Sequence, residues 1–91
     1  MSPAIFTFTG NLLAERTQHF ATWAPGRTQR ATGESFQVGG KGINVAKMLA
    51  RFGTPATALA FAGGSTGADC RAWLARQRFA SELFATVAAT R

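Results

Sequence analysis

The sequence is short of negative charge, of cysteine and of long apolar runs. Its 91 residues include four acidic and ten basic residues, which leaves a net charge of +6. The single cysteine, Cys70, excludes an internal disulfide and a cysteine-based zinc site, and it favours a reducing, cytoplasmic setting. No apolar run is long enough to span a membrane, and the N-terminus lacks the basic stretch that opens a signal peptide. These absences predict a cytoplasmic protein.

The surplus of positive charge is spread along the chain and indicates an anionic partner. A basic arm is missing, and aromatic residues do not alternate with basic ones as they do on single-strand nucleic-acid platforms. A few isolated arginines suit a phosphorylated small molecule better than nucleic acid. A small basic nucleic-acid-binding domain therefore stays as the weaker alternative.

Large apolar side chains are abundant for a chain of this length. Hydrophobic residues make up 46% of the sequence, with eight Phe and two Trp, so it is not disordered by composition. A chain this short leaves much of its apolar surface uncovered. We therefore expect something else to cover part of that surface.

Apolar runs and turn signals alternate along the chain as they do in an α/β fold with a largely parallel sheet and flanking helices. Residues 4–9 (AIFTFT) and 56–62 (ATALAFA) are typical of buried strands, and a third strand is expected within 81–90. Residues 12–38 have no helical period. They predict a small antiparallel β excursion with short strands at 17–23, 27–32 and 35–38.

A first helix is predicted from about Ile43, with Gly53 as its C-terminal cap and Pro55 as a stop. Its buried face is expected to consist of Val45, Ala46, Leu49 and Phe52. A second helix is predicted from a capping box formed by Thr66 and Asp69 to about residue 78. Its covered side is expected to include Cys70, Trp73, Leu74, and Gln77 or Phe79. Cys70 is thus interpreted as a small buried side chain and not as a nucleophile.

The stretch VGGKGINVAKMLARFG, residues 38–53, places three glycines and a lysine directly before the first helix. A nucleotide phosphate loop requires glycine where Ser35 stands and Ser or Thr where Gly42 stands. A dinucleotide fingerprint requires Gly or Ala at the place of Val45, and an acidic residue about twenty positions further on, which is absent. Both nucleotide loops are therefore excluded.

The same stretch still has properties of a ligand-binding loop. Consecutive glycines let the backbone approach a bound molecule with no Cβ in the way. The helix that follows presents unpaired N–H groups and its positive dipole end to that place. Asn44 in the first turn can both donate and accept, as a sugar hydroxyl requires. The alternative is a plain turn before a helix, with Lys41 solvated.

These residues resemble the first signature of the ribokinase-like, phosphofructokinase B family of carbohydrate kinases. GGKGINVAKMLARFG (39–53), followed by TPATALAFAGG (54–64), matches the signature in spacing as well as in residue type. The segment GKGINVAK is most similar to the branch of 1-phosphofructokinase and tagatose-6-phosphate kinase. The resemblance covers nearly the whole chain. It implies that residues 1–91 are the N-terminal part of a ribokinase-like domain.

The resemblance also implies residues that bind a sugar. TFTGNLLAERT, residues 7–17, is similar to the branch's opening motif TLNPAIDRT: Asn11 matches it, and Glu15 stands where the family has an aspartate that binds sugar hydroxyls. Residues 16–38 correspond to a β-stranded lid, which would cover the sugar and could form a homodimer. Arg27 falls close to a lid lysine that contacts the substrate phosphate in this branch.

Four further residues complete the implied sugar side. Gly40, Lys41 and Asn44 would hold the sugar, and Arg91 matches an arginine that contacts the phosphate of the incoming sugar phosphate. The implied reaction is phosphoryl transfer from ATP, with Mg²⁺, to a sugar or sugar phosphate, a ketohexose phosphate in this branch. Neither nucleic acid nor a membrane is an implied partner.

The resemblance places ATP, Mg²⁺ and the catalytic aspartate in a later glycine-rich segment of the family, to which nothing in residues 1–91 corresponds. The one aspartate, Asp69, is assigned to a helix cap, so no catalytic or metal-binding residue is assigned here. The 91-residue chain by itself is therefore predicted to be inactive. Leu12 and Glu15 depart from the family pattern and leave a second alternative open, a truncated non-catalytic remnant.

Overall fold

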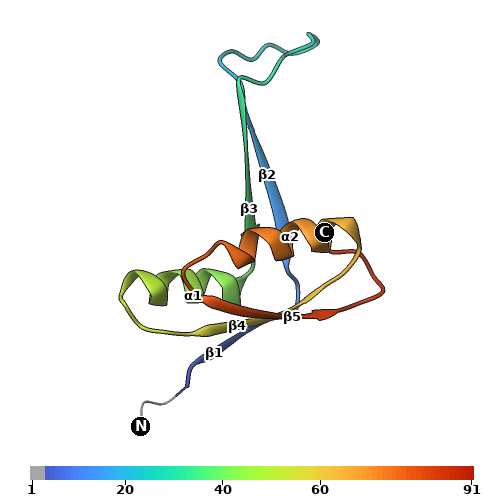
Figure 1. Ribbon diagram of the computed structural model, residues 1–91. Coiled ribbons are helices and arrows are strands. Elements are labelled where there is room, and N and C mark those ends of the chain that lie inside the picture. The colour runs from blue at the N-terminus through green and yellow to red at the C-terminus, as the bar shows by residue number, and fades with distance from the viewer. Residues whose placement is uncertain (1–3) are drawn as a thin grey trace.

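The computed structural model describes residues 4–91, in which two helices lie against a parallel sheet and a long hairpin projects beyond them (Figure 1). The predicted α/β fold with a small antiparallel part is confirmed. Neither helix of this part of the chain has the length and apolar character needed to cross a membrane. In chain order the elements are β1 (Phe6–Thr9), β2 (Leu13–His19), β3 (Gly33–Gly39), α1 (Lys41–Arg51), β4 (Thr57–Ala62), α2 (Gly64–Ala75) and β5 (Ala80–Ala85).

The main sheet consists of three parallel strands in the order β1-β4-β5, so the chain crosses it twice in the same direction. Parallel crossovers are almost always right-handed, and two steps in one direction therefore place both connecting helices on one face. Figure 1 shows α1 and α2 on the same side of the sheet. Among the residues described, no helix covers the opposite face.

The two faces of the sheet carry different side chains. The buried side chains of the covered face are short and let the helices approach closely: Thr7, Thr9, Ala58, Ala60 and Ala62. The open face carries exposed aromatic side chains: Phe6, Phe8, Phe61 and Phe84. The rings of Phe8 and Phe61 meet edge to face at 5.7 Å, and Phe84 lies 6.2 Å from Phe61. This open aromatic face accounts for much of the apolar load of the sequence.

The buried face of α1 is only partly the one that the sequence predicts, because Ala46 is buried and Leu49 half-buried as expected but two larger residues are not. The helix begins at Lys41, and its buried residues are Gly42, Ile43 and Ala46. Val45 and Phe52, which were expected inside, are 50% and 77% exposed. Gly42 and Ala46 let the helix axis approach the sheet closely, with Ile43 as the large side chain between them. This close approach therefore outweighed the apolar pattern of Val45 and Phe52.

The helix ends agree with the sequence in one case and disagree in the other. Gly53 closes α1 as predicted, with φ +75° and its N–H bonded to a carbonyl of the last turn. The predicted capping box at Thr66 and Asp69 is wrong, because α2 begins at Gly64 and no side chain of its own caps it. Thr66 already lies inside the first turn, so its hydroxyl cannot serve as the N-cap. The covered side of α2 is as predicted, with Cys70, Trp73, Leu74, Gln77 and the following Phe79 buried or half-buried.

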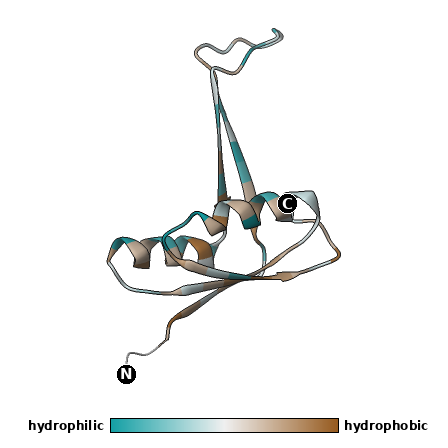
Figure 2. Ribbon diagram, viewed as in Figure 1, coloured by the Kyte–Doolittle hydropathy of each residue, from teal (hydrophilic) through white to brown (hydrophobic). Residues whose placement is uncertain are grey.

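The antiparallel part is a single hairpin of two strands. The β2–β3 ladder extends from Leu13 opposite Gly39 to His19 opposite Gly33. The predicted strand at 27–32 is wrong, and the one at 17–23 continues only to His19, since residues 20–32 form an irregular tip. In Figure 2 the stem of the hairpin carries more hydrophilic colour than the sheet strands. The outer part of the stem is thus suited to contact with water, whereas Val38 at its base is buried in the core.

Arg16 fastens the hairpin to α2. Its guanidinium lies 3.2 Å from Glu34 on β3 and 3.4 Å from Asp69 on α2, and it stacks 5.0 Å from the Phe36 ring. Asp69 therefore bonds the hairpin and does not cap its own helix. The molecule measures 59 × 34 × 18 Å, with a radius of gyration of 16.0 Å, whereas a compact domain of this length would have about 12 Å. The projecting hairpin explains the difference.

Candidate functional site

The carboxyl ends of β1, β4 and β5 meet at one edge of the sheet, and both helices begin at that edge. Ligands of open α/β sheets bind at such an edge. The segments that follow β1 and β5 enclose a cleft of about 590 Å³ there, which we call the carboxyl-edge cleft. Asn11 lines it from the first segment, and Thr86, Thr90 and Arg91 line it from the last.

The electrostatics of this cleft favour an anion. The positive dipole ends of α1 and α2 lie at the same edge of the sheet. The guanidinium of Arg91 adds a full positive charge, and none of the four acidic residues lines the cleft. A phosphate-bearing ligand would therefore find complementary charge here.

Two glycines at the junction of β3 and α1 pack against β1 and the residues that follow it. A Cβ on Gly40 would lie 2.5 Å from Cγ2 of Thr9 and 3.4 Å from the carbonyl oxygen of Asn11. A Cβ on Gly42 would lie 2.8 Å from the carbonyl oxygen of Phe8 and still closer to the Thr9 hydroxyl. Gly40 also has φ +131°, a conformation that other residues rarely adopt. These glycines are thus required by packing within the chain, whatever ligand binds nearby.

Thr9 holds the first turn of α1 against the sheet. Its hydroxyl accepts a hydrogen bond of 3.1 Å from the N–H of Ile43, one of the N–H groups that the helix itself leaves unpaired. This role of Thr9 was not predicted from the sequence. The signal was present in the alternation of Thr and Phe in residues 6–9, which places both threonines on one face.

Thr90 has the corresponding position at the start of α2. The N–H of Gly63 donates to the Thr90 hydroxyl at 3.0 Å, and the N–H of Thr90 donates to the carbonyl of Gly63 at 3.0 Å. The next residue, Arg91, accepts a hydrogen bond from the N–H of Ala14 at 2.6 Å. These bonds bring Arg91 to the carboxyl edge, although it follows β5 by several irregular residues.

Glu15 lies beside the glycine loop. Its carboxylate accepts a hydrogen bond of 2.9 Å from Gln37, the residue opposite it in the hairpin. A Cβ on Gly39 would lie 2.5 Å from Oε1 of Glu15, so the glycine leaves room for this carboxylate. The extra methylene of glutamate, compared with aspartate, is thereby accommodated.

The predicted site residues are only partly brought together. Asn11 and Arg91 line the same cleft, and Gly40 packs against the backbone of Asn11. Lys41 is exposed at the first residue of α1. Asn44 lines a different cavity, between α1 and the segment that follows α2. Arg27 lies in the tip of the hairpin, which Figure 1 shows far from the sheet.

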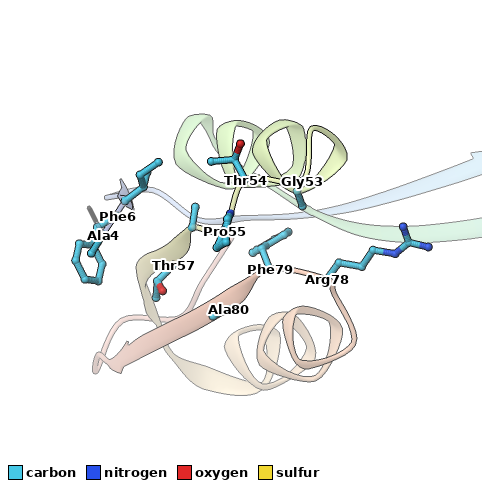
Figure 3. A pocket seen from close by; sticks show the side chains of 12 residues that line it. Ala4, Phe6, Gly53, Thr54, Pro55, Thr57, Arg78, Phe79 and Ala80 are labelled. Atoms are coloured by element: carbon cyan, nitrogen blue, oxygen red, sulfur yellow. The ribbon is translucent and has the colours of Figure 1, made fainter. Parts of the chain in front are cut away.

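A larger cavity lies at the opposite edge of the sheet, where the strands begin. It has a volume of about 860 Å³ and is lined mainly by apolar residues around Pro55 and Phe79 (Figure 3). Arg78 borders it, but its side chain extends away from Pro55 and Thr57. This cavity lacks convergent polar groups, so the smaller carboxyl-edge cleft is the better candidate for sugar chemistry.

Cys70 is a packing residue of α2. Its side chain is fully buried in the core with Leu74 and Ile43. Burial raises the pKa of the thiol, and the negative charge of Asp69 raises it further. The neutral thiol is the form that dominates at neutral pH, as the interpretation of Cys70 as a small buried side chain requires.

Comparison with known proteins identifies the class to which this arrangement belongs. The sequence model of the pfkB family of carbohydrate kinases matches residues 10–82. That span includes the hairpin, the glycine loop, both helices and β4. The chain therefore belongs to the pfkB family of carbohydrate kinases.

Two curated relatives narrow the similarity to kinases of sugar phosphates. A D-tagatose-1-phosphate kinase of Bacillus licheniformis is 38% identical over 63 residues, which are 69% of this chain and 21% of the relative. A 1-phosphofructokinase of Borreliella burgdorferi is 54% identical over 37 residues, which are 41% of this chain and 12% of the relative. The chain thus aligns with about a fifth or less of the length of these relatives.

Solved structures show the same fold over nearly the whole chain. Phosphofructokinase-2 of Escherichia coli in complex with fructose-6-phosphate superposes with a TM-score of 0.86 at 32% identity, covering 97% of this chain and 29% of that one. A tetrameric inhibited form of the same enzyme gives a TM-score of 0.85. The predicted ribokinase-like fold is confirmed by these neighbours.

Proposed function

We propose that this chain forms the sugar-binding part of an ATP-dependent kinase that phosphorylates a ketohexose phosphate. The observation that carries the proposal is the meeting of Asn11 and Arg91 in one cleft at the carboxyl edge, beside Gly40 and the first turn of α1. An amide that can donate and accept suits a sugar hydroxyl, and a guanidinium suits a phosphate dianion. The positive charge of the cleft, its position at the carboxyl ends of the strands and the family of the chain all support this proposal.

The other predicted residues have supporting roles in the proposal. Glu15 would accept hydrogen bonds from sugar hydroxyls through the carboxylate oxygen that Gln37 does not hold. Lys41 is the first residue of α1, from which its ammonium could approach the phosphate group that Arg91 would bind. Neither Glu15 nor Lys41 lines the cleft itself, so both would contact a ligand that extends beyond it. Asn44 and Arg27 lie further away and would reach the sugar only after a change in the helix surface or in the hairpin. The hairpin would then act as the lid, and a homodimer formed through it stays a prediction.

ATP and Mg²⁺ are assigned to a further part of the kinase. ATP supplies the phosphoryl group, and a base must remove the proton from the sugar hydroxyl that attacks it. Within residues 4–91 no three His, Cys, Asp or Glu side chains lie close enough together to hold a metal ion. The open aromatic face would be covered by helices of that further part. A cytoplasmic location fits this activity and also stays a prediction.

The proposal is tested by calorimetric titration of the 91-residue chain with fructose 1-phosphate. We expect saturable binding that Arg91→Gln weakens about tenfold, since one charge-assisted hydrogen-bonding group to phosphate is lost. Arg71→Gln, which removes the same charge outside the cleft, should leave the affinity unchanged. With ATP and Mg²⁺ added, the chain should form no fructose bisphosphate.

Two results would contradict this proposal. One is the absence of binding at millimolar sugar phosphate by a chain with a folded circular dichroism spectrum. The other is an equal loss of affinity in Arg91→Gln and Arg71→Gln, which would mean that only net charge attracts the ligand. Phosphorylation of the sugar by the chain alone would contradict the assignment of ATP to a further part.

A further inference from the structure

A second concave site lies between α1 and the segment that follows α2. Its volume is about 610 Å³. Four cationic side chains line it: Lys47 and Arg51 from α1, and Arg76 and Arg78 from the segment after α2. No acidic residue lines this site, which we call the basic pocket, and no residue lines both it and the carboxyl-edge cleft.

The four cations of the basic pocket have no ion-pair partner within residues 4–91. Both ion pairs in that part of the chain are made by Arg16. The acidic residues of the sequence lie elsewhere: Glu15 and Glu34 on the hairpin, Asp69 beside Arg16, and Glu82 on β5. Positive charge is therefore concentrated at this pocket without an acidic side chain to pair with it.

Helix dipoles offset only part of this charge. Arg51 lies in the last turn of α1, and Arg76 is the C-cap of α2, so the negative ends of both dipoles lie near the pocket. Each helix end is equivalent to roughly half a negative charge. Two ends therefore neutralise about one of the four positive charges, and a net of about three remains for an external anion.

The remaining lining indicates the size and type of that anion. Met48 and Phe79 supply apolar surface, while Asn44 and Gln77 supply amides. A volume of this size is in the range of small-molecule sites, and a single concave pocket gives no extended track for a nucleic-acid backbone. We infer that the basic pocket binds a small polyvalent phosphate, such as a diphosphate or triphosphate group, separately from the sugar phosphate.

The test is calorimetric titration of the 91-residue chain with inorganic pyrophosphate at 25 °C in moderate salt. We expect the double variant Arg76→Gln/Arg78→Gln to bind at least about tenfold more weakly, because two charge-assisted contacts are lost. The matched control is Arg30→Gln/Arg71→Gln, which removes the same charge at positions outside both sites. It should change the affinity less than about twofold, as expected for distant, screened charges.

A fluorescence measurement locates the bound anion. The ammonium of Lys47 lies 5.0 Å over the ring of Trp73, and Trp23→Phe leaves Trp73 as the sole tryptophan. An anion that draws Lys47 toward the pocket should change the Trp73 emission with the same midpoint as the calorimetric curve. The change should disappear in the Arg76→Gln/Arg78→Gln background.

Three outcomes would overturn the inference. Equal losses in the test and control pairs would show a non-specific charge effect. Loss of pyrophosphate binding in Arg91→Gln, with Arg76→Gln/Arg78→Gln unaffected, would assign the anion to the carboxyl-edge cleft and leave the proposed function intact. Retention of a single-stranded oligonucleotide without any binding of pyrophosphate would replace the small anion by nucleic acid.

Discussion

The chain passes from a glycine pair into a helix twice, and the two junctions are held by different parts of the molecule. At the first, Gly39-Gly40 before α1, the fastening hydroxyl belongs to Thr9 in a buried strand. At the second, Gly63-Gly64 at α2, it belongs to Thr90 in an irregular segment after β5. Similar sequence features thus produce one junction built into the sheet and one that depends on a peripheral segment.

Replacement of these glycines by alanine should give the largest difference in stability between the two junctions. Gly40→Ala combines a φ of +131° with a Cβ 2.5 Å from Thr9, and we expect it to lower the free energy of unfolding by about 3 kcal/mol or more. Gly64→Ala has φ +65° and meets Ala89 at 3.0 Å, in a segment that can shift, and should cost about 1–2 kcal/mol. Urea unfolding measures both.

The control for this pair is Gly53→Ala, where φ is +75° and nothing lies within 4 Å of the new Cβ. It measures the cost of alanine in a left-handed backbone conformation without any steric contact, about 1 kcal/mol. If Gly40→Ala cost no more than Gly53→Ala, the packing of the first junction against β1 would be refuted.

Removal of the two fastening hydroxyls should have the next largest effect. Thr9→Val leaves the buried N–H of Ile43 without a partner and should lower the free energy of unfolding by about 2 kcal/mol. Thr90→Val removes a bond that is only part-buried, since Thr90 itself is partly exposed, and should cost about 0.5–1 kcal/mol. Amide exchange at Ile43 and Gly63 reports each bond directly. Equal effects at both sites would contradict the contrast between the junctions.

The ionic link between the hairpin and α2 should have the smallest effect. Asp69→Asn breaks the 3.4 Å pair with Arg16, which is more than half exposed on both sides. Exposed pairs contribute about 0.2–1 kcal/mol. A double-mutant cycle with Arg16→Gln, measured by urea unfolding, should give a coupling in this range that falls with added salt. A coupling energy that does not change with salt would mean that contacts other than this ion pair hold the hairpin against α2.

The fold could be predicted from the sequence where local chemistry decides the structure. The strands at 4–9 and 56–62, the Gly53 cap and the parallel alternation all follow from local patterns, and they are observed. The resemblance that identified the family rests on the glycine loop, whose spacing is itself a local feature.

The errors lie where distant parts of the chain meet. Val45 and Phe52 form a reasonable apolar stripe, but the choice of the buried side of α1 depended on how closely Gly42 could approach Phe8. Asp69 looked like a cap because Arg16, 53 residues away, is not a visible partner in the sequence. The joining of Asn11 and Arg91 in one cleft likewise depends on the sheet order and not on spacing.

The open row of Phe8, Phe61 and Phe84 has a consequence for how this chain should behave in solution. A surface that gains free energy whenever it is covered makes the folded population depend on protein concentration, by mass action. The melting temperature of the isolated chain should therefore rise on going from micromolar to hundreds of micromolar. Thermodynamically, the uncovered side of the sheet acts as a binding site for any apolar surface that the solution supplies.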